Sequence, residues 1–350
     1  MPVFVEAAGG RPMWTEKRRG GGRQGFGPQT LRIALVNSMP DAALADTETQ
    51  FFDLLNEASN GLAVQLKLVS LPQVPRGERG LERLQQLYYG VEELWNHAYD
   101  AIIVTGTEPQ QPDLRQEPYW AAMTSLFDWA HKNTISTILS CLAAHAGVLH
   151  SDGISRVRLP GKMFGVFDFP NVGPHTLTSR SGKVLRFPHS RWNGLSADAL
   201  SACGYQVLTQ NEQAGVDCFV KRKEKSLVVH FQGHPEYQAE TLFKEYRRDV
   251  RRYLRGERES YPGAPFGYFS GEAAESLTTF QQNAMSNRSE ETMNGFPEAL
   301  LTSELQNGWH DSAVTIYRTW LQFVSEKKSA AACFVPVKVR RSGNAVRYAE

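Results

Sequence analysis

Residues 136–147 read Ser-Thr-Ile-Leu-Ser-Cys-Leu-Ala-Ala-His-Ala-Gly, and this stretch decides the fold. Its first half is apolar and predicts a buried strand that ends at Cys141, and its second half predicts a helix. A nucleophile on such a sharp turn projects clear of the sheet, and the next N–H, that of Leu142, is left to bind an oxyanion. The small side chains of Ser140 and Ala143 fit the tight turn. Cys141 is therefore a candidate nucleophile, although a free cysteine in an apolar stretch is also a common core residue.

A second apolar strand, predicted over residues 227–231, leads into Gln-Gly-His-Pro-Glu-Tyr at residues 232–237. His234 and Glu236 thus follow the end of a strand, which is where open α/β sheets carry their functional residues. A cysteine nucleophile needs a base to form the thiolate and a carboxylate to hold the imidazole tautomer. We therefore predict a catalytic triad of Cys141, His234 and Glu236. Taken alone, His-Pro-Glu is also a plain turn stiffened by proline.

Strands and helices alternate along the first part of the chain. Strands are expected at residues 31–36, 64–71, 99–106 and 134–141, and helices at residues 43–58, 81–97 and 120–131. Strands that alternate with helices of this length favour an α/β fold with a doubly wound, mostly parallel sheet flanked by helices. An antiparallel excursion is expected over residues 151–220, which are rich in Gly, Pro and short β-like runs.

The remaining segments complete the expected domain organisation. Residues 1–29, rich in Gly and Arg, are expected to form a mobile tail, because they hold too little apolar surface to offset their ordering entropy. Residues 30–256 are expected to form the main domain. Over residues 257–326 we expect an irregular excursion followed by a helix, near residues 311–324, that packs on the same domain. Residues 327–350 are expected to form a second tail.

Composition narrows the classes of function. The chain has 350 residues, with 38 Lys and Arg against 37 Asp and Glu, so its formal net charge is +1. This balance gives no global reason to expect nucleic acid or an anionic membrane as partner. The four cysteines show no paired spacing, so we expect reduced thiols and no metal site. No apolar stretch approaches the roughly 20 residues of a membrane-spanning helix, and we expect a cytoplasmic protein.

An ordered set of motifs resembles the homoserine O-acyltransferase family, the succinyl- and acetyltransferases of the class I glutamine amidotransferase-like superfamily. The resemblance extends over about residues 31–325. Its main motifs are Val36–Pro40, Tyr99–Gly106, Leu159–Phe167, Pro188–Arg191 and Gly233–Tyr237. The amidotransferase parent usually carries glycines on both sides of its cysteine, where Leu139 and Ala143 stand here. This departure favours the acyltransferase branch, and the resemblance implies an amidotransferase-like fold.

The resemblance also implies an activity, namely transfer of an acyl group from acyl-CoA to the hydroxyl of homoserine in methionine biosynthesis. The acyl group would pass through a thioester on Cys141. The oxyanion would lie against the Leu142 N–H and a backbone N–H near Gly106 or Thr107. No bound cofactor is implied, and the partners are the small molecules homoserine and acyl-CoA, with a homodimer left open.

The positions that match the substrate-binding residues of the family are Lys162, Ser190 and Arg248. A guanidinium can clamp the homoserine carboxylate with two parallel hydrogen bonds. Arg248 also belongs to a basic run, Arg247–Arg255, that lies off the apolar stripe of its predicted helix. The alternative interpretation of Arg248 is therefore a solvated helix face.

The acyl donor depends on the loop after residue 106. In relatives, an acidic residue a few positions past this glycine disfavours the succinyl carboxylate, and by spacing the matching position is Gln110. Because glutamine can donate a hydrogen bond to a distal carboxylate, Gln110 favours succinyl-CoA. Glu108 acts in the opposite direction if its side chain faces the acyl group, since like charges repel.

Two other classes of function stay open. The same residues would serve a glutamine amidotransferase or a related cysteine hydrolase, for which release of ammonia from glutamine is the discriminating observation. The fold would also serve a non-catalytic binding or regulatory protein. A burst of CoA release on mixing with acyl-CoA separates the enzyme from the binding protein.

Overall fold

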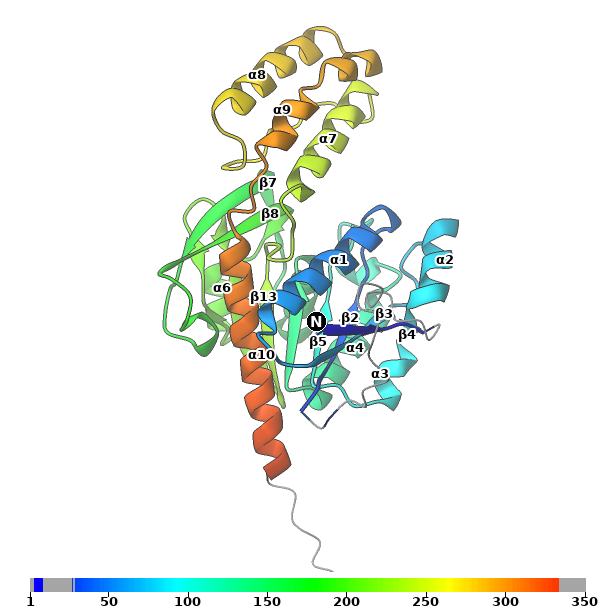
Figure 1. Cartoon of the computed structure of the whole chain (residues 1–350), viewed down its shortest axis with the longest axis vertical. Coiled ribbons are helices and arrows are strands. Elements are labelled where there is room, and N and C mark those ends of the chain that lie inside the picture. Colours follow the sequence, from blue (N-terminus) through cyan, green and yellow to red (C-terminus); the bar gives the residue numbers. More distant parts are fainter. Residues whose placement is uncertain (1–2, 9–26, 28, 334–350) are drawn as a thin grey trace, which may run out of the picture.

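The computed structural model describes residues 3–8, 27 and 29–333; the remainder of the two expected tails lies outside the described residues. A nine-stranded sheet forms the centre of the molecule, with strand order β1-β3-β2-β5-β6-β13-β12-β9 and the short β4 paired with β3 (Figure 1). The parallel strands are β1 Val3–Glu6, β3 Val64–Ser70, β2 Leu31–Val36, β5 Ala101–Val104, β6 Ser136–Ser140, β13 Ser226–Phe231 and β4 Tyr89–Gly90. The antiparallel strands are β12 Cys218–Lys223 and β9 Gln206–Val207. The predicted doubly wound, mostly parallel sheet is confirmed.

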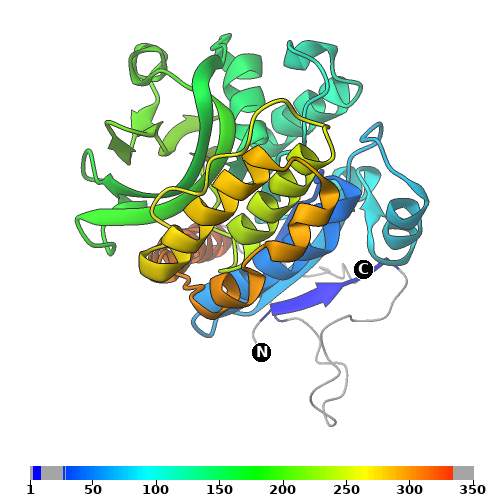
Figure 2. The ribbon, with the colours of Figure 1, turned by 90° about the horizontal axis from the view of Figure 1, so that it is seen from above.

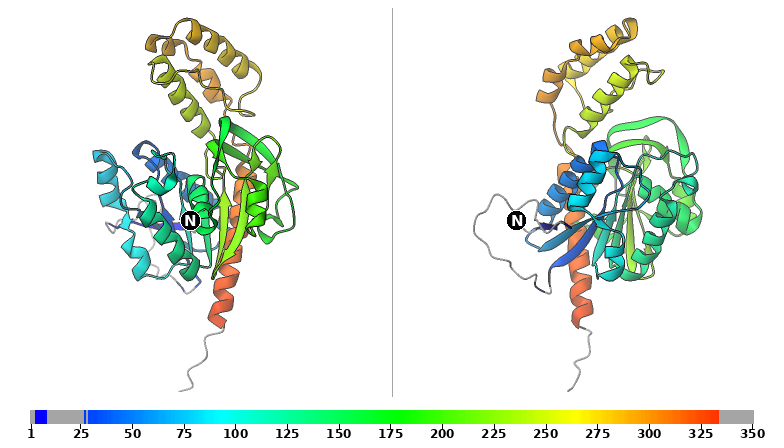
Figure 3. Two further views of the ribbon diagram at one scale, coloured as in Figure 1. Left: turned by 180° about the vertical axis from the view of Figure 1, so that it is seen from behind. Right: turned by 90° about the vertical axis from the view of Figure 1, so that its right-hand side faces the viewer.

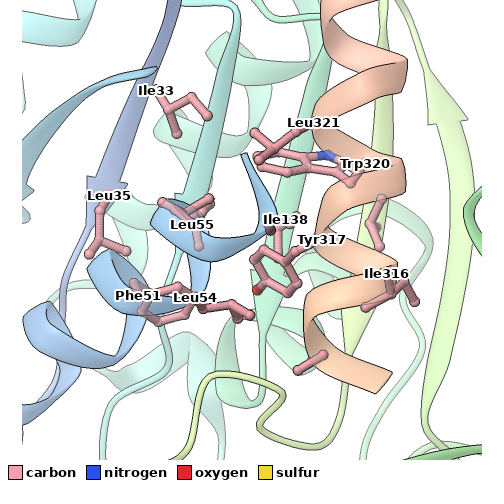
Figure 4. Packing of buried hydrophobic residues seen from close by; sticks show 14 of the residues in the cluster. Ile33, Leu35, Phe51, Leu54, Leu55, Ile138, Ile316, Tyr317, Trp320 and Leu321 are labelled. Carbon is pink, nitrogen blue, oxygen red and sulfur yellow. The ribbon is translucent and has the colours of Figure 1, made fainter. Parts of the chain in front are cut away.

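Helices cover both faces of this sheet, because successive strand side chains point to opposite faces. On one face, α1 Asp41–Ala58 and α10 His310–Cys333 lie side by side. Figure 4 shows Phe51 and Leu55 of α1 with Trp320 of α10, packed against strand residues that include Ile33 and Ile138. The other face is covered by α3 Glu92–Asn96, α4 Trp120–Asn133 and α5 Leu142–Asp152. Two apolar cores, one on each face, thus hold the sheet rigid.

The expected antiparallel excursion is present. Its main part is a long ribbon of two strands, β7 Val157–Pro170 and β8 Val184–Gly194, which pair antiparallel. Smaller elements complete it, namely η2 Thr176–Thr178, α6 Ala197–Ala202, β10 Gln210–Asn211 and β11 Gly215–Val216. The ribbon rises beside the carboxyl end of β13 (Figure 3).

A helical layer lies above the sheet; its first helix, which carries Arg248, was predicted, whereas the rest was expected to be irregular. It consists of α7 Thr241–Leu254, α8 Gly271–Ser286, η3 Glu290–Gly295 and α9 Glu298–Ser303 (Figures 1 and 2). The expectation of an irregular excursion after residue 257 is therefore wrong for residues 271–303, most of which are helical. Helix α8 buries Ala273, Leu277, Phe280 and Ala284 on one stripe against α7, so few but correctly spaced apolar residues are enough to fix it.

Three further expectations need correction. The helix predicted over 81–97 is two helices, α2 Glu78–Leu87 and α3, because the intervening β4 pairs with β3. Residues 3–6 form β1 instead of a tail, since Val3 and Val5 are buried against the sheet. Helix α10 extends to Cys333, beyond the predicted end at residue 324. The short η1 Leu114–Gln116 follows β5, and no helix in the described part of the chain has the length and apolar character needed to cross a membrane.

Candidate active site

The site lies where three neighbouring parallel strands end. Leu139 of β6 pairs with Val104 of β5, and Ser140 pairs with Phe231 of β13. The segments that follow these strands therefore meet at one edge of the sheet, as expected for an open α/β fold. They carry Gly106 after β5, Cys141 after β6 and His234 after β13.

Cys141 has the backbone geometry of a nucleophile on a sharp turn. Its φ of 52° and ψ of −111° lie in a region that non-glycine residues rarely adopt. Its N–H donates to the carbonyl of Phe231 at 2.7 Å, which ties the turn to the end of β13, and α5 begins at the next residue. The side chain is partly exposed. The strain is local and sits at the residue predicted to react, as is common in active sites.

The residues predicted to bind the oxyanion lie beside Cys141. Leu142 is the first residue of α5, so its N–H has no acceptor within the helix. Gly106 packs directly against it, because a Cβ placed on Gly106 would lie 3.0 Å from the Leu142 nitrogen. Thr107 follows in the same loop and is partly buried. The structure thus brings the three predicted oxyanion residues to one place.

His234 lies between the other two members of the predicted triad. Its Nδ1 is 2.8 Å from Oε1 of Glu236, and its ring also hydrogen-bonds the Cys141 side chain, which leaves Nε2 for the sulfur. Burial alone would lower the pKa of His234. The negative charges and hydrogen bonds of Cys141 and Glu236 outweigh burial, and the pKa lies well above its usual value. This environment stabilises the imidazolium form of His234.

A second buried pair supports the loop that carries His234. His189 Nε2 lies 3.2 Å from Oδ1 of Asp217, and both side chains are fully buried. The same Oδ1 accepts the Gly233 N–H at 2.9 Å, and the His234 N–H donates to the carbonyl of Pro188 at 2.8 Å. Burial lowers the pKa of His189 to about 4, so this imidazole is neutral near pH 7. His189 and Asp217 therefore act on the loop as structural supports.

Gly233→Ala tests this support, because the position has no room for a methyl group. An added Cβ would lie 2.7 Å from Nε2 of His189, 2.8 Å from Oδ1 of Asp217 and 2.9 Å from the Pro188 carbonyl oxygen. We expect a loss of about 1–3 kcal/mol in stability, as for other overpacked sites, and a larger loss of activity because His234 moves with the loop. Thermal unfolding and kcat measure the two effects. Gly263→Ala, where the added Cβ meets nothing within 4 Å, is the matched control, and a Gly233→Ala enzyme equal to that control would contradict this account.

The predicted substrate-binding residues gather around Glu245 of α7. Lys162 Nζ lies 3.3 Å from one carboxylate oxygen of Glu245, and the Ser190 hydroxyl donates to the same oxygen at 2.5 Å. The Tyr237 hydroxyl donates to the other oxygen at 2.9 Å, and the Tyr237 ring stacks on His234 with ring centroids 4.2 Å apart. Glu245 is thus connected through Tyr237 to the triad.

Arg248 lies one turn farther along α7. Its guanidinium contacts Oδ1 of Asp249 at 3.1 Å, while Lys162 contacts the other oxygen of Asp249 at 3.3 Å. Its side chain remains 57% exposed, so most of its donors are accessible. Burial alone would lower the pKa of Arg248, but the negative charges of Asp249, Glu245 and Glu108 together raise it. The structure therefore places Arg248 at the cluster, and also on the basic face of its helix.

The loop after β5 carries the proposed donor-selecting residues. Gln110 and Glu108 are both exposed. Within the described residues, Gln110 makes no hydrogen bond to the triad or to the Glu245 cluster. The predicted role of Gln110 in donor choice thus stays a prediction.

Comparison with known proteins identifies the family of this chain. The family model described as homoserine O-succinyltransferase matches residues 23–330. The chain belongs to this family. It is 45% identical over 293 residues to a homoserine O-succinyltransferase from Rhodopseudomonas palustris, covering 84% of this chain and 88% of the relative. It is 42% identical over 302 residues to one from Methylorubrum extorquens, covering 86% and 89%.

Among solved structures, the fold of this succinyltransferase-family chain is similar to that of a glutamine amidotransferase from Thermotoga maritima. The two share 13% sequence identity with a TM-score of 0.48, over 85% of this chain and 98% of the other. The predicted family resemblance is confirmed by the sequence relatives, which place the chain among acyltransferases.

Several residues of the site were not selected from the sequence. Glu245 sits inside a charged run on α7, Asp217 lies ahead of a strand, and Tyr237 closes the His-Pro-Glu motif. Tyr237 could have been selected, because it adjoins the triad in the sequence. Glu245 lies three residues before Arg248 and therefore on the same face of the helix, which is the signal that could have identified it.

Proposed function

We propose that this chain is a homoserine O-succinyltransferase that transfers a succinyl group from succinyl-CoA to the homoserine hydroxyl, in the methionine pathway of the cytoplasm. The observation that carries the proposal is His234 held between Cys141 and Glu236 at the strand ends, in a chain of this family. The proposed mechanism has two half-reactions, and this geometry supports each of them.

In the first half-reaction, the Cys141 thiolate attacks the thioester carbonyl, and a new C–S bond forms. The carbonyl oxygen becomes an oxyanion beside the N–H of Leu142, in the pocket closed by Gly106. The bond from the carbon to the CoA sulfur then breaks, and the leaving thiolate takes the proton of the His234 imidazolium. The products are free CoA, a neutral His234 and a succinyl thioester on Cys141.

In the second half-reaction, the homoserine hydroxyl attacks the thioester carbon. Neutral His234 takes the hydroxyl proton, which regenerates the imidazolium held by Glu236. The C–S bond to Cys141 breaks, and Cys141 leaves as a thiolate, so the ion pair of the resting enzyme is restored. Both the substrate and the intermediate are thioesters, which makes sulfur a suitable nucleophile.

The cluster on α7 suits the charges of homoserine. An amino acid carries an ammonium and a carboxylate close together, so its site needs an anion and a cation at matching positions. Glu245 and Asp249 supply carboxylates, and the exposed donors of Arg248 supply a guanidinium for the homoserine carboxylate. Lys162 and Ser190 hold Glu245 in place.

Arg248→Ala should slow transfer from the acylated enzyme to homoserine. Loss of hydrogen bonds to a charged group is expected to lower kcat/KM for homoserine by about 10- to 100-fold. The measurement is single-turnover transfer from enzyme that already carries succinyl-Cys141. Arg248→Lys, which keeps the charge but loses the planar fork, is expected to restore part of the rate. An unchanged rate in Arg248→Ala would mean that Arg248 does not bind homoserine and only forms part of a solvated helix face.

A comparison of donors tests the proposed function itself. With homoserine as acceptor, kcat/KM for succinyl-CoA is expected to exceed that for acetyl-CoA by about tenfold or more, since a distal carboxylate offers a charged hydrogen-bonding group. Serine as acceptor is the control for the second substrate. A preference for acetyl-CoA would contradict the succinyl assignment. Turnover with neither donor, together with ammonia release from glutamine, would favour the amidotransferase alternative instead.

A further inference from the structure

One face of α7 is basic along almost its whole length. The cations stand at positions 244, 247, 248, 251, 252 and 255, a spacing of three and four residues that places them on one helical face. They are Lys244, Arg247, Arg248, Arg251, Arg252 and Arg255, and these six side chains together line a cavity of about 240 Å³. Every lining residue carries a cationic side chain, so the side chains around the cavity offer only hydrogen-bond donors.

We propose that this cavity binds the phosphate groups of the CoA donor. The inference rests on the proposed function and deepens it, because it names the part of the enzyme that recognises the nucleotide end of the substrate. Arginine is suited to this role, since its planar fork binds phosphate oxygens through two parallel hydrogen bonds. No part of the triad is needed for this contact, so phosphate binding and chemistry are separable.

The position of α7 fits a donor that reaches from this face to Cys141. The helix begins just after the His-Pro-Glu turn and leads away from the sheet (Figures 1 and 3). At 1.5 Å per residue, its cations extend over about 16 Å along the axis. Arg248 belongs both to the cavity and to the cluster that reaches His234 through Glu245 and Tyr237. CoA is a long, flexible molecule with its thioester at one end and its phosphates toward the other, which matches this layout.

Acidic groups surround the cavity without lining it. Five of them pair with its cations, and their side chains are 40–57% exposed: Asp46, Glu240, Glu257, Glu290 and Glu298. The sixth is Asp249, which pairs with Arg248. Exposed ion pairs contribute little free energy, so a phosphate with more negative charge can replace them. Arg251 differs from its neighbours, because within the described residues it makes no ion pair.

Arg251→Glu is the decisive variant, because it reverses a charge without breaking an ion pair of the fold. We compare acylation of Cys141 by succinyl-CoA and by succinyl-pantetheine, which carries the same thioester without phosphates. The expected result is about a tenfold higher KM for succinyl-CoA and no change for succinyl-pantetheine. Arg251→Lys, which keeps the charge but loses the planar fork, should keep only part of the affinity. Inorganic pyrophosphate should compete with succinyl-CoA more strongly in the wild type than in Arg251→Glu. Arg79→Glu, at an exposed position of α2, is the control for a general charge effect.

The outcomes separate this inference from the proposed function. An equal change for both donors, or no change for either, overturns the phosphate site while Cys141 acylation still stands. Binding of a nucleic acid that depends on Arg251, without an effect on succinyl-CoA, also overturns it and assigns the face to another polyanion. If neither donor acylates the wild-type enzyme, the proposed function itself has failed.

Discussion

Cys141→Ala is expected to abolish succinyl transfer to homoserine, with a fall of at least about 10⁴-fold in kcat, the scale on which loss of a catalytic nucleophile acts. The reason is structural, because among the cysteines that the structure describes only Cys141 combines a strained φ of 52°, a contact with His234 and the adjacent Leu142 N–H. Without the sulfur, no acyl-enzyme can form. Mass spectrometry after incubation with succinyl-CoA measures this directly, since the wild type should gain one succinyl group on the Cys141 peptide and the variant none.

Cys203→Ala is the matched control for Cys141→Ala. Cys203 is also a partly exposed free thiol, but it lies at the end of α6, away from His234. Its replacement should leave both the adduct and the turnover near wild-type values. Burial raises the pKa of the Cys218 thiol well above its usual value, so Cys218 should stay unmodified. A succinyl group on Cys203 or Cys218, or turnover by Cys141→Ala, would contradict the mechanism.

Sequence periodicity predicted the sheet better than the helical layer above it. Strand β2 begins and ends at the predicted residues, because the run Leu31–Val36 is apolar and buried apart from the exposed Arg32. Helix α8 was missed because its buried stripe includes two alanines and the segment as a whole is polar. The prediction of one continuous helix across Tyr88 was wrong because tertiary contacts hold Tyr88 and Tyr89 in an extended conformation. The Tyr88 hydroxyl donates to Glu48 and accepts from Asn37, and Tyr89 then pairs with β3.

The same distinction between local pattern and long-range contact applies to the candidate site. The triad and the oxyanion loop could be predicted, since both follow strands whose ends are visible in the sequence. The cluster around Glu245 depends on how the β7–β8 ribbon meets α7, a long-range contact that no local pattern encodes. Lys162 and Ser190 come from the two strands of that ribbon. The resemblance to relatives named these two residues, but only the structure brings them to one carboxylate.

His234→Asn is expected to slow both half-reactions, and transfer to homoserine by about 10²–10⁴-fold, the usual contribution of a general base. Asparagine can accept a hydrogen bond but takes no proton, so the resting ion pair with Cys141 and the base for the hydroxyl are lost together. Alkylation of Cys141 by iodoacetamide at different pH values measures the first loss. Single-turnover transfer to homoserine measures the second.

The pH dependence of the two half-reactions gives the sharpest test of His234. In the free enzyme its pKa is raised, so the imidazolium persists as the pH rises through the usual histidine range and is lost only above it. Acylation removes the negative charge of Cys141, which is one cause of that rise, so the pKa must fall. Transfer needs neutral His234, and its rate should therefore increase with pH around a lower pKa than the free enzyme shows. Glu236→Gln removes the other charge and should shift both pKa values down while slowing transfer, because the imidazolium formed in that step loses its partner. Equal pKa values in the free and acylated enzymes would mean that Cys141 and His234 do not form an ion pair.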